Sequence, residues 1–180
     1  MKILIKYLLI LFLIVIVILQ TNSGNKNMEI KVTSSAFKEG ELIPSKYTCD
    51  GVNVSPQIIW ANFPEITKSF VLISDDPDAP VGTWVHWVVY NIGANINELK
   101  ESFPKDSKFP DGILQGTTDF RTTGYGGPCP PSGTHRYYFK IYALDLMLDV
   151  KPGLTKKEIL GKMEGHVIAE GQLMGKYRRK

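Results

Sequence analysis

The sequence has few of the residues that bind metal ions or act as nucleophiles. Among its 180 residues are two cysteines, Cys49 and Cys129, and three histidines. There is no HExxH or CxxC motif, no Cys/His cluster of the kind that binds zinc, and no motif for an activated serine or cysteine. We therefore predict no metal, no cofactor and no catalytic residue.

Clustered basic charge is also missing from the middle of the chain. The net charge is +3, and much of the excess lies at the two ends, near Lys2, Lys6 and Lys26 and within 176–180. Nucleic-acid binding requires Lys and Arg clustered on one face of a protein. The nearly neutral middle therefore argues against a nucleic-acid partner.

Long apolar runs are absent except at the N-terminus. Two lysines precede an uncharged apolar run, 7–19, and polar residues follow it. This order is typical of a secretory signal peptide, and the run is short for a bilayer span, which needs about 20 apolar residues. We expect 1–27 to engage the membrane as a cleaved signal peptide or a retained anchor with a linker. The domain, 28–180, would then lie outside the cytoplasm, secreted, periplasmic or membrane-anchored.

The two cysteines both lie in turn-like segments, YTCDG and GPCPP. Export permits a disulfide between Cys49 and Cys129. Such a bridge would close a long loop and contribute about 4 kcal/mol on the chain-entropy model. Two separate buried thiols are the alternative.

Short strands broken by turns dominate the chain from residue 29 onward. The runs 57–60, 69–74, 84–92 and 135–144 are apolar and rich in β-branched and aromatic residues. Glycine and proline separate them. This spacing predicts a mainly β protein, a sandwich or barrel, rather than βαβ units.

One helix is expected late in the chain. Thr155 and Glu158 form a capping box, and Ile159, Met163 and Val167 recur every four residues. The segment AEGQLMGKY that follows can continue this helix or form a closing strand.

Two histidines lie at the polar ends of apolar strands. Strict alternation puts His86 on one face with Trp84 and Val88, and His135 on one face with Tyr137. This arrangement is typical of the rim of a pocket at the end of a sheet. A buried structural histidine is the ordinary alternative for each.

Two polar segments surround these histidines. Asp76 closely follows the run 69–74, and if this run pairs with the next strand, Asp76 can lie beside His86 and fix its tautomer. In the loop GYGGPCPPSG, Gly126 and Gly127 could adopt positive φ and point their N–H groups at an anion, and one proline could be cis. Each segment alone is an ordinary turn, so the site hypothesis depends on their occurring together.

These residues resemble the phosphatidylethanolamine-binding protein family, in its bacterial and archaeal branch that is often described as Raf-kinase-inhibitor-like. The resemblance covers about residues 29–177 and is carried by SDDPDAP (74–80), WVHWVVYNI (84–92), GYGGPCPPSGTHRYYFKIYALD (124–145), YTCDGVNVSPQIIW (47–60) and GHVIAEGQLMGKY (165–177). It implies a β-sandwich with a Greek-key sheet core, a small anion pocket and short edge helices, including a C-terminal helix.

The resemblance also implies particular site residues and ligands. Family members bind phosphate, phosphorylethanolamine head groups or acetate, and some inhibit kinases or proteases through protein contacts. The C-terminal segment that closes the pocket in the mammalian branch has no counterpart in KYRRK, and the loop 93–119 has no matching motif. By the family pattern the pocket residues would be Asp76, His86, His135 and Tyr137, with its wall supported by Trp84, Asp78, Gly127 and Pro131.

Three functions are compatible with these residues. The leading one is an exported, non-catalytic binding protein for a small phosphate- or carboxylate-containing ligand, a phospholipid head group being one candidate. The second is a protein-interaction module that inhibits a protease or a kinase-like partner. The third is a metal-assisted hydrolase that uses Asp76, Asp78, His86 and His135, which the missing metal and nucleophile motifs disfavour.

Overall fold

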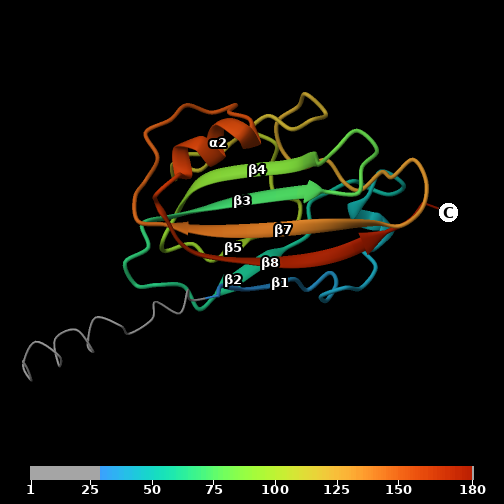
Figure 1. The fold of residues 1–180 in the computed structure, drawn as a ribbon, viewed down its shortest axis with the longest axis horizontal. Helices are drawn as coiled ribbons and strands as arrows, with labels where there is room; N and C mark the ends of the chain where they lie inside the picture. Colours follow the sequence, from blue (N-terminus) through green and yellow to red (C-terminus); the bar gives the residue numbers. More distant parts are fainter. Residues whose placement is uncertain (1–28, 180) are drawn as a thin grey trace, which may run out of the picture.

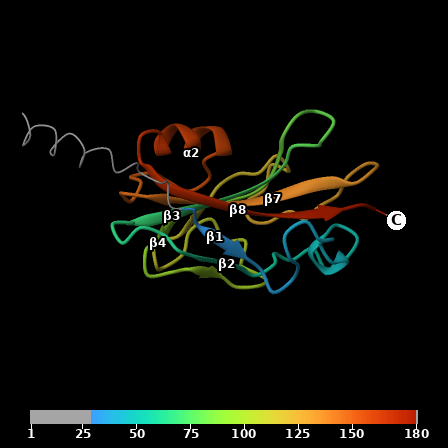
Figure 2. The same cartoon turned by 60° about the horizontal axis from the view of Figure 1, so that its bottom comes forward.

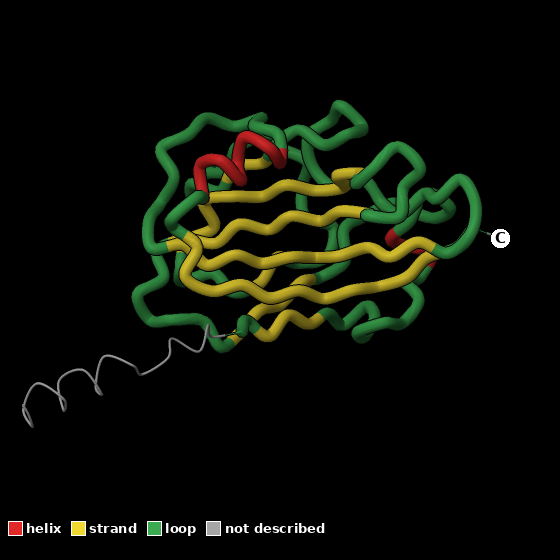
Figure 3. Tube along the Cα trace, viewed as in Figure 1, coloured by secondary structure: helices red, strands yellow, loops and turns green. Residues whose placement is uncertain are grey.

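The computed structural model describes residues 29–179, which form two antiparallel sheets in layers (Figures 1 and 2). The prediction of a mainly β fold is confirmed. The smaller sheet has the order β1 (Lys31–Thr33), β2 (Ile58–Ala61), β5 (Glu98–Leu99). The larger sheet has the order β6 (Leu114–Gln115), β4 (Trp84–Gly93), β3 (Ser69–Asp76), β7 (His135–Leu144), β8 (Val167–Tyr177). Its long strands run side by side in Figure 3.

The main core lies between the two sheets. Trp60 from β2 packs in one cluster with Phe70, Leu72, Trp87 and Phe139 from the larger sheet, and all five are fully buried. Burying large aromatic side chains in this way removes much apolar area from water and supplies most of the stabilisation of such a layer.

A second core covers the other face of the larger sheet, below the helix α2 (Lys156–Met163). Ile159 and Met163 of the helix pack with Val71 and Ile73 of β3. Because β3 is therefore buried on both faces, its sequence is a continuous apolar run rather than an alternating one.

The helix ends earlier than predicted. The capping box is present, with the Thr155 side chain accepting from the Glu158 N–H and the Glu158 side chain accepting in return. The helix stops at Met163, however, and Gly165, at φ +79°, turns the chain into β8. Val167 thus begins a strand and is exposed, and the segment AEGQLMGKY pairs along β7. The predicted late helix is thus present as α2, and the last regular element of the described residues is the strand β8.

The segment 93–119, which carries no matching motif, is organised by the buried Gln115 of β6. Its side-chain carbonyl accepts from the Trp87 Nε1–H at 2.7 Å, and its amide donates to the carbonyls of Pro104 at 2.8 Å and Asp106 at 2.7 Å. A buried amide with all these bonds satisfied fixes the path of the chain around it. This path leads directly to the residues around Phe120 that reach the pocket.

Within residues 29–179 there is no helix of the length and apolar character that a bilayer crossing needs. The predicted signal peptide or anchor, 1–27, lies outside the described residues. A short 3-10 helix, η1 (Ser45–Tyr47), precedes Cys49.

Candidate functional site

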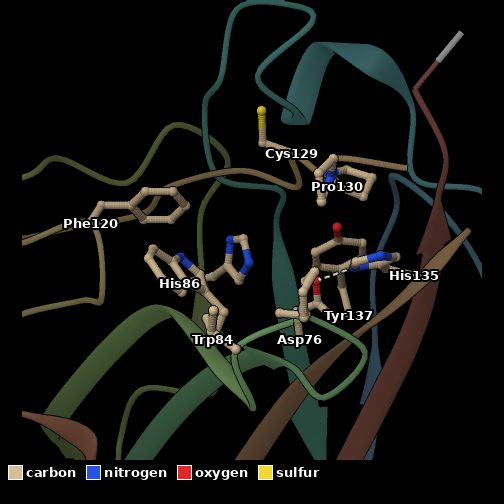
Figure 4. A pocket seen from close by; sticks show the side chains of 12 residues that line it. Asp76, Trp84, His86, Phe120, Cys129, Pro130, His135 and Tyr137 are labelled. Carbon is tan, nitrogen blue, oxygen red and sulfur yellow. Dashed lines mark hydrogen bonds and ion pairs between the residues drawn. The ribbon is translucent and has the colours of Figure 1, made fainter. Parts of the chain in front are cut away.

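A pocket of about 300 Å³ lies at the end of the larger sheet where β3 and β8 end and β7 begins. This end of the sheet is on the right in Figure 1. Figure 4 shows the side chains that face it. The structure brings together six of the eight predicted site residues in its lining, which are Asp76, Trp84, His86, Pro131, His135 and Tyr137. The other two, Asp78 and Gly127, support the wall from outside the lining.

Asp76 holds His135 rather than His86, which corrects the pairing expected from the sequence. Its Oδ2 accepts a hydrogen bond from His135 Nδ1 at 2.7 Å, and both side chains are buried. On the other edge of β3, Asp76 lies opposite Trp84 and not beside His86. The carboxylate therefore fixes the orientation of the His135 ring, whose Nε2 is left for the pocket.

His86 lies at an irregularity of the β3–β4 ladder. Ser74 pairs with Trp87 and Asp75 pairs with Val85, so the register passes over His86. A bulge of this kind re-aims a side chain next to a site. As a result Val85 joins the core under α2, while His86 packs against Tyr137 on the opposite face. The prediction that His86 shares a face with Val88 is therefore wrong.

The His86 ring is fixed on three sides. Its Nδ1 donates to the carbonyl oxygen of Gly126 at 2.6 Å, and the Gly126 N–H donates back to the His86 carbonyl at 3.0 Å. The rings of Phe120 and Tyr137 pack edge to face against it, each with centroids 5.2 Å away. Burial lowers the pKa of His86 below its usual 6.5. At neutral pH the ring is uncharged, with its hydrogen on Nδ1 and a lone pair on Nε2.

This burial predicts an acid-sensitive fold. The unfolded chain binds a proton at His86 near pH 6.5, whereas the folded protein does so only at lower pH. The unfolded state thus binds more protons in this window. The contribution of the neutral His86 ring to the free energy of unfolding is therefore fully present above about pH 6.5 and is lost as the pH falls further.

Chemical denaturation between about pH 7.5 and 5 would measure this loss. In His86→Gln the part of this pH dependence that is due to the His86 ring should disappear, while His166→Gln, at a partly exposed histidine, should keep it. An unchanged pH dependence in His86→Gln would contradict the assignment.

The Tyr137 hydroxyl is the clearest sign of a binding site. Its oxygen is buried and has no hydrogen-bond partner among the described residues. Burial, helped by the nearby negative charge of Asp76, raises the pKa of Tyr137, so the hydroxyl stays protonated. Buried polar atoms normally have partners. A protonated hydroxyl without one, at the wall of a pocket, is a donor available to a ligand.

The glycine loop does not form the predicted anion nest. Neither Gly126 nor Gly127 has a positive φ, and both N–H groups are used within the protein, the Gly127 N–H by Asn53 Oδ1 at 2.7 Å. Glycine is needed here for close packing. A Cβ at Gly127 would lie 2.4 Å from the Tyr47 carbonyl oxygen, and one at Gly126 would lie 2.6 Å from the Phe120 ring. No described peptide bond, those of this loop included, is cis.

Asp78 clamps the loop 76–80 to the start of β7. Its Oδ2 accepts from the Arg136 backbone N–H and from Nε, each at 2.9 Å, and its Oδ1 accepts from Nη2 at 2.6 Å. The bonds from the Arg136 side chain lower the pKa of Asp78 to about 2. Asp78 therefore shapes the pocket wall without facing the pocket.

A disulfide ties the other wall in place. Cys49 and Cys129 are bonded, with their Cα atoms 5.4 Å apart, so the predicted bridge is confirmed and separate thiols are excluded. The Cys49 N–H also donates to the Pro128 carbonyl at 3.1 Å. Cys129 and the neighbouring Pro130 line the pocket, so the bridge holds the loop that forms this wall.

Phe120 is a lining residue that the sequence did not reveal. It is half exposed, lines the pocket, and contacts Trp84 and His86 with ring centroids at 5.5 Å and 5.2 Å. The preceding Asp119 fixes it by accepting from the Val85 N–H at 2.7 Å. A lone aromatic in the polar segment TTDFRTTG was the only available signal.

Within residues 29–179, no three or more His, Cys, Asp or Glu side chains gather closely enough to hold a metal ion. The hydrolase alternative would need four of the site residues as metal ligands, but each is bonded within the protein. Asp76 is bonded to His135, Asp78 to Arg136, and His86 to the Gly126 carbonyl.

Fold and site together define a β-sandwich protein with a small, partly apolar pocket at one end of its larger sheet. Residues 33–178 match the family model described as "Phosphatidylethanolamine-binding protein". Because the match spans most of the chain, this protein belongs to the phosphatidylethanolamine-binding protein family, as the sequence predicted.

Individual relatives agree with this assignment. A UPF0098 protein of Methanothermobacter thermautotrophicus is 50% identical over 150 residues, covering 83% of this chain and 99% of the relative. The crystal structure of YbcL of E. coli, described as a member of the mammalian PEBP family, superposes with a TM-score of 0.78 at 36% identity, over 84% of this chain and 99% of that one. The crystal structure of CT736 of Chlamydia trachomatis, described as a PEBP homologue, gives 0.77 at 41% identity, over 84% and 99%.

Proposed function

We propose that this protein is an exported, non-catalytic binding protein whose end pocket holds a small ligand with a phosphate or carboxylate group. The observation that carries the proposal is the buried, unpartnered hydroxyl of Tyr137, which lies between two histidines at the wall of a pocket of about 300 Å³. A pocket of that volume accommodates a small head group. Phosphate oxygens accept well from such donors.

The pocket lining supports binding rather than catalysis. No serine, threonine or free cysteine side chain is among the residues that line it, and Cys129 is held in the disulfide. A disulfide-bonded cysteine has no thiolate to act as a nucleophile. The Asp76–His135 pair therefore has no serine, threonine or free cysteine side chain in the lining to activate.

Two observations support export and one bears on orientation. The N-terminal order of charge, apolar run and polar residues fits a leader, and disulfides persist mainly outside the cytoplasm. Glu29 pairs with Glu170, near the start of β8. The pocket lies at the other end of this strand, where Tyr177 is opposite His135. A retained anchor would thus join the domain at the end of the sheet away from the pocket.

Titration with phosphate and phosphorylethanolamine, followed by amide NMR shifts, tests the proposal. We expect a dissociation constant between millimolar and micromolar, with shifts in the segments around His86 and His135. Replacing either histidine with alanine should weaken binding about tenfold or more, since each removes a hydrogen bond to a charged group. His166→Ala, at a partly exposed histidine that is paired with Asp145 outside the pocket, is the matched control. The proposal fails if neither segment shifts.

The interaction-module alternative is favoured by one observation. Val81, 80% exposed, and the half-exposed Phe120 flank the pocket. Exposed apolar residues beside a pocket are typical of contact surfaces. A protease or kinase partner would show as inhibition by the wild type that Val81→Asp abolishes, and a panel of such enzymes without inhibition would remove this alternative.

A further inference from the structure

The pocket offers a ligand an unusual set of groups. No lysine or arginine lines it. The neighbouring Arg136 is bound on Asp78 through three hydrogen bonds. The polar atoms available to a ligand are the Tyr137 hydroxyl and one nitrogen on each histidine, the Nε2 of His86 and the Nε2 of His135.

These groups carry no net positive charge near neutral pH. Asp76 and His135 form a pair whose charge is 0 or −1, depending on whether His135 is protonated. His86 is uncharged, because its environment is apolar and its ordinary pKa is already below 7. A fully ionised dianion would therefore have no compensating charge in the pocket.

The charged groups around His86 are also all acidic. From β3 come Asp75 and Asp76, and after β6 comes Asp119. Asp75 is neutralised by Lys140 and Lys156 on the far face. From β7, the neutral Tyr137 packs on the His86 ring. The lysine and arginine of β7 are paired with Asp75 and Asp78, and neither lines the pocket that Nε2 faces.

The direction of the hydrogen bonds limits the class of ligand further. The Nδ1 of His86 faces a carbonyl oxygen, that of Gly126, and must therefore donate. In the neutral ring the Nε2 then accepts. Tyr137 has a hydroxyl hydrogen to give. The ligand that satisfies both groups has an O–H and a bare oxygen on the same centre.

We propose that the pocket selects oxyacids that retain one proton, hydrogen phosphate and phosphomonoesters, over sulfate and phosphodiesters. The inference rests on the proposed function and names its ligand class. In the bound state the ligand O–H donates to His86 Nε2, and a second ligand oxygen accepts from Tyr137. Sulfate has no hydrogen to donate near neutral pH, and neither does a phosphodiester. An intact phospholipid head group is a diester, so a free phosphomonoester fits the pocket better than the lipid.

Calorimetric titration of the full chain with four probes tests this inference. Near the second pKa of a phosphomonoester, at about pH 6, methyl phosphate should bind about 10- to 100-fold more tightly than dimethyl phosphate, because the diester has no hydrogen to donate and leaves a buried acceptor without a donor. Inorganic phosphate should exceed sulfate by a similar factor. The diester has a single negative charge, so the ester pair separates hydrogen bonding from charge.

The outcomes separate the two proposals. Equal affinities within each pair would overturn the selectivity and leave the anion pocket standing. Absence of binding by all four probes would overturn the proposed function and this inference with it.

Two variants assign the selectivity to His86. The amide of His86→Gln can donate as well as accept near the Nε2 position, so the preference for the monoester should fall towards 1. Tyr137→Phe should weaken all four probes and keep the preference. A preference that survives in His86→Gln but is lost in Tyr137→Phe would contradict the role of His86. The four affinities of the wild type test the selectivity even if a variant does not fold.

Discussion

Replacing Asp76 with alanine is expected to lower the free energy of unfolding by about 3–5 kcal/mol. Asp76 and His135 form a buried pair at 2.7 Å, and the other Asp76 oxygen accepts from the Asp78 N–H at 2.8 Å. The alanine variant leaves a buried imidazole and a backbone donor without partners. Urea denaturation at about pH 7 measures the difference from the wild type.

Two control variants make this result specific. Asp76→Asn keeps an acceptor for His135 and should lose clearly less stability than the alanine variant. Asp78→Ala breaks a pair with the largely exposed Arg136 and should lose much less still. If Asp76→Ala unfolded within about 1 kcal/mol of the wild type, the buried pair would not make the contribution assigned to it. Phosphate binding should also weaken in Asp76→Ala, because His135 loses its orientation.

Removing the disulfide should have the second large effect. The double variant Cys49→Ser with Cys129→Ser is expected to lose about 2–5 kcal/mol, since the bridge joins residues 80 apart and restricts the unfolded chain. For a domain of this size that corresponds to a fall in Tm of about 5–15 °C. Phosphate affinity should fall too, because Cys129 and Pro130 form one wall of the pocket.

Reduction provides the control for the disulfide. A reductant should lower the Tm of the wild type towards that of the double variant and should leave the double variant unchanged. Identical melting of the wild type with and without reductant, once thiol titration shows the bridge open, would contradict the stabilisation.

The strands could be predicted because their burial is regular. Phe70 to Ile73 are buried on both faces of the larger sheet, so β3 appears in the sequence as an unbroken apolar run. The faces of β7 were also predicted correctly, since its alternation is uninterrupted from His135 to Ile141. Helix α2 was located by its capping box, but its end depended on Gly165, whose turn into β8 the periodicity did not reveal.

The partners in the site could not be predicted in the same way. Strict alternation assumes an even ladder, and the register between β3 and β4 passes over His86. That single irregularity moves His86 to the other face and leaves Asp76 to pair with His135. Phe120 reaches the pocket through contacts organised by Gln115 and Asp119, which lie outside the segments that carry the family resemblance and follow no local pattern.

The glycine loop shows a similar limit. Gly126 and Gly127 fitted a nest as single residues, yet their N–H groups are taken by His86 and Asn53. What requires glycine is the close approach of the Phe120 ring to Gly126 and of the Tyr47 carbonyl, which is distant in sequence, to Gly127. Only the three-dimensional structure reveals this requirement.

A crystal structure of the protein with phosphorylethanolamine tests the central claim most directly. The account predicts the phosphate group in the end pocket, with one oxygen within about 3.2 Å of the Tyr137 hydroxyl and another as near to His86 Nε2. An empty pocket at saturating ligand, or a phosphate group bound elsewhere, for instance at the exposed Arg178 and Arg179, would contradict it.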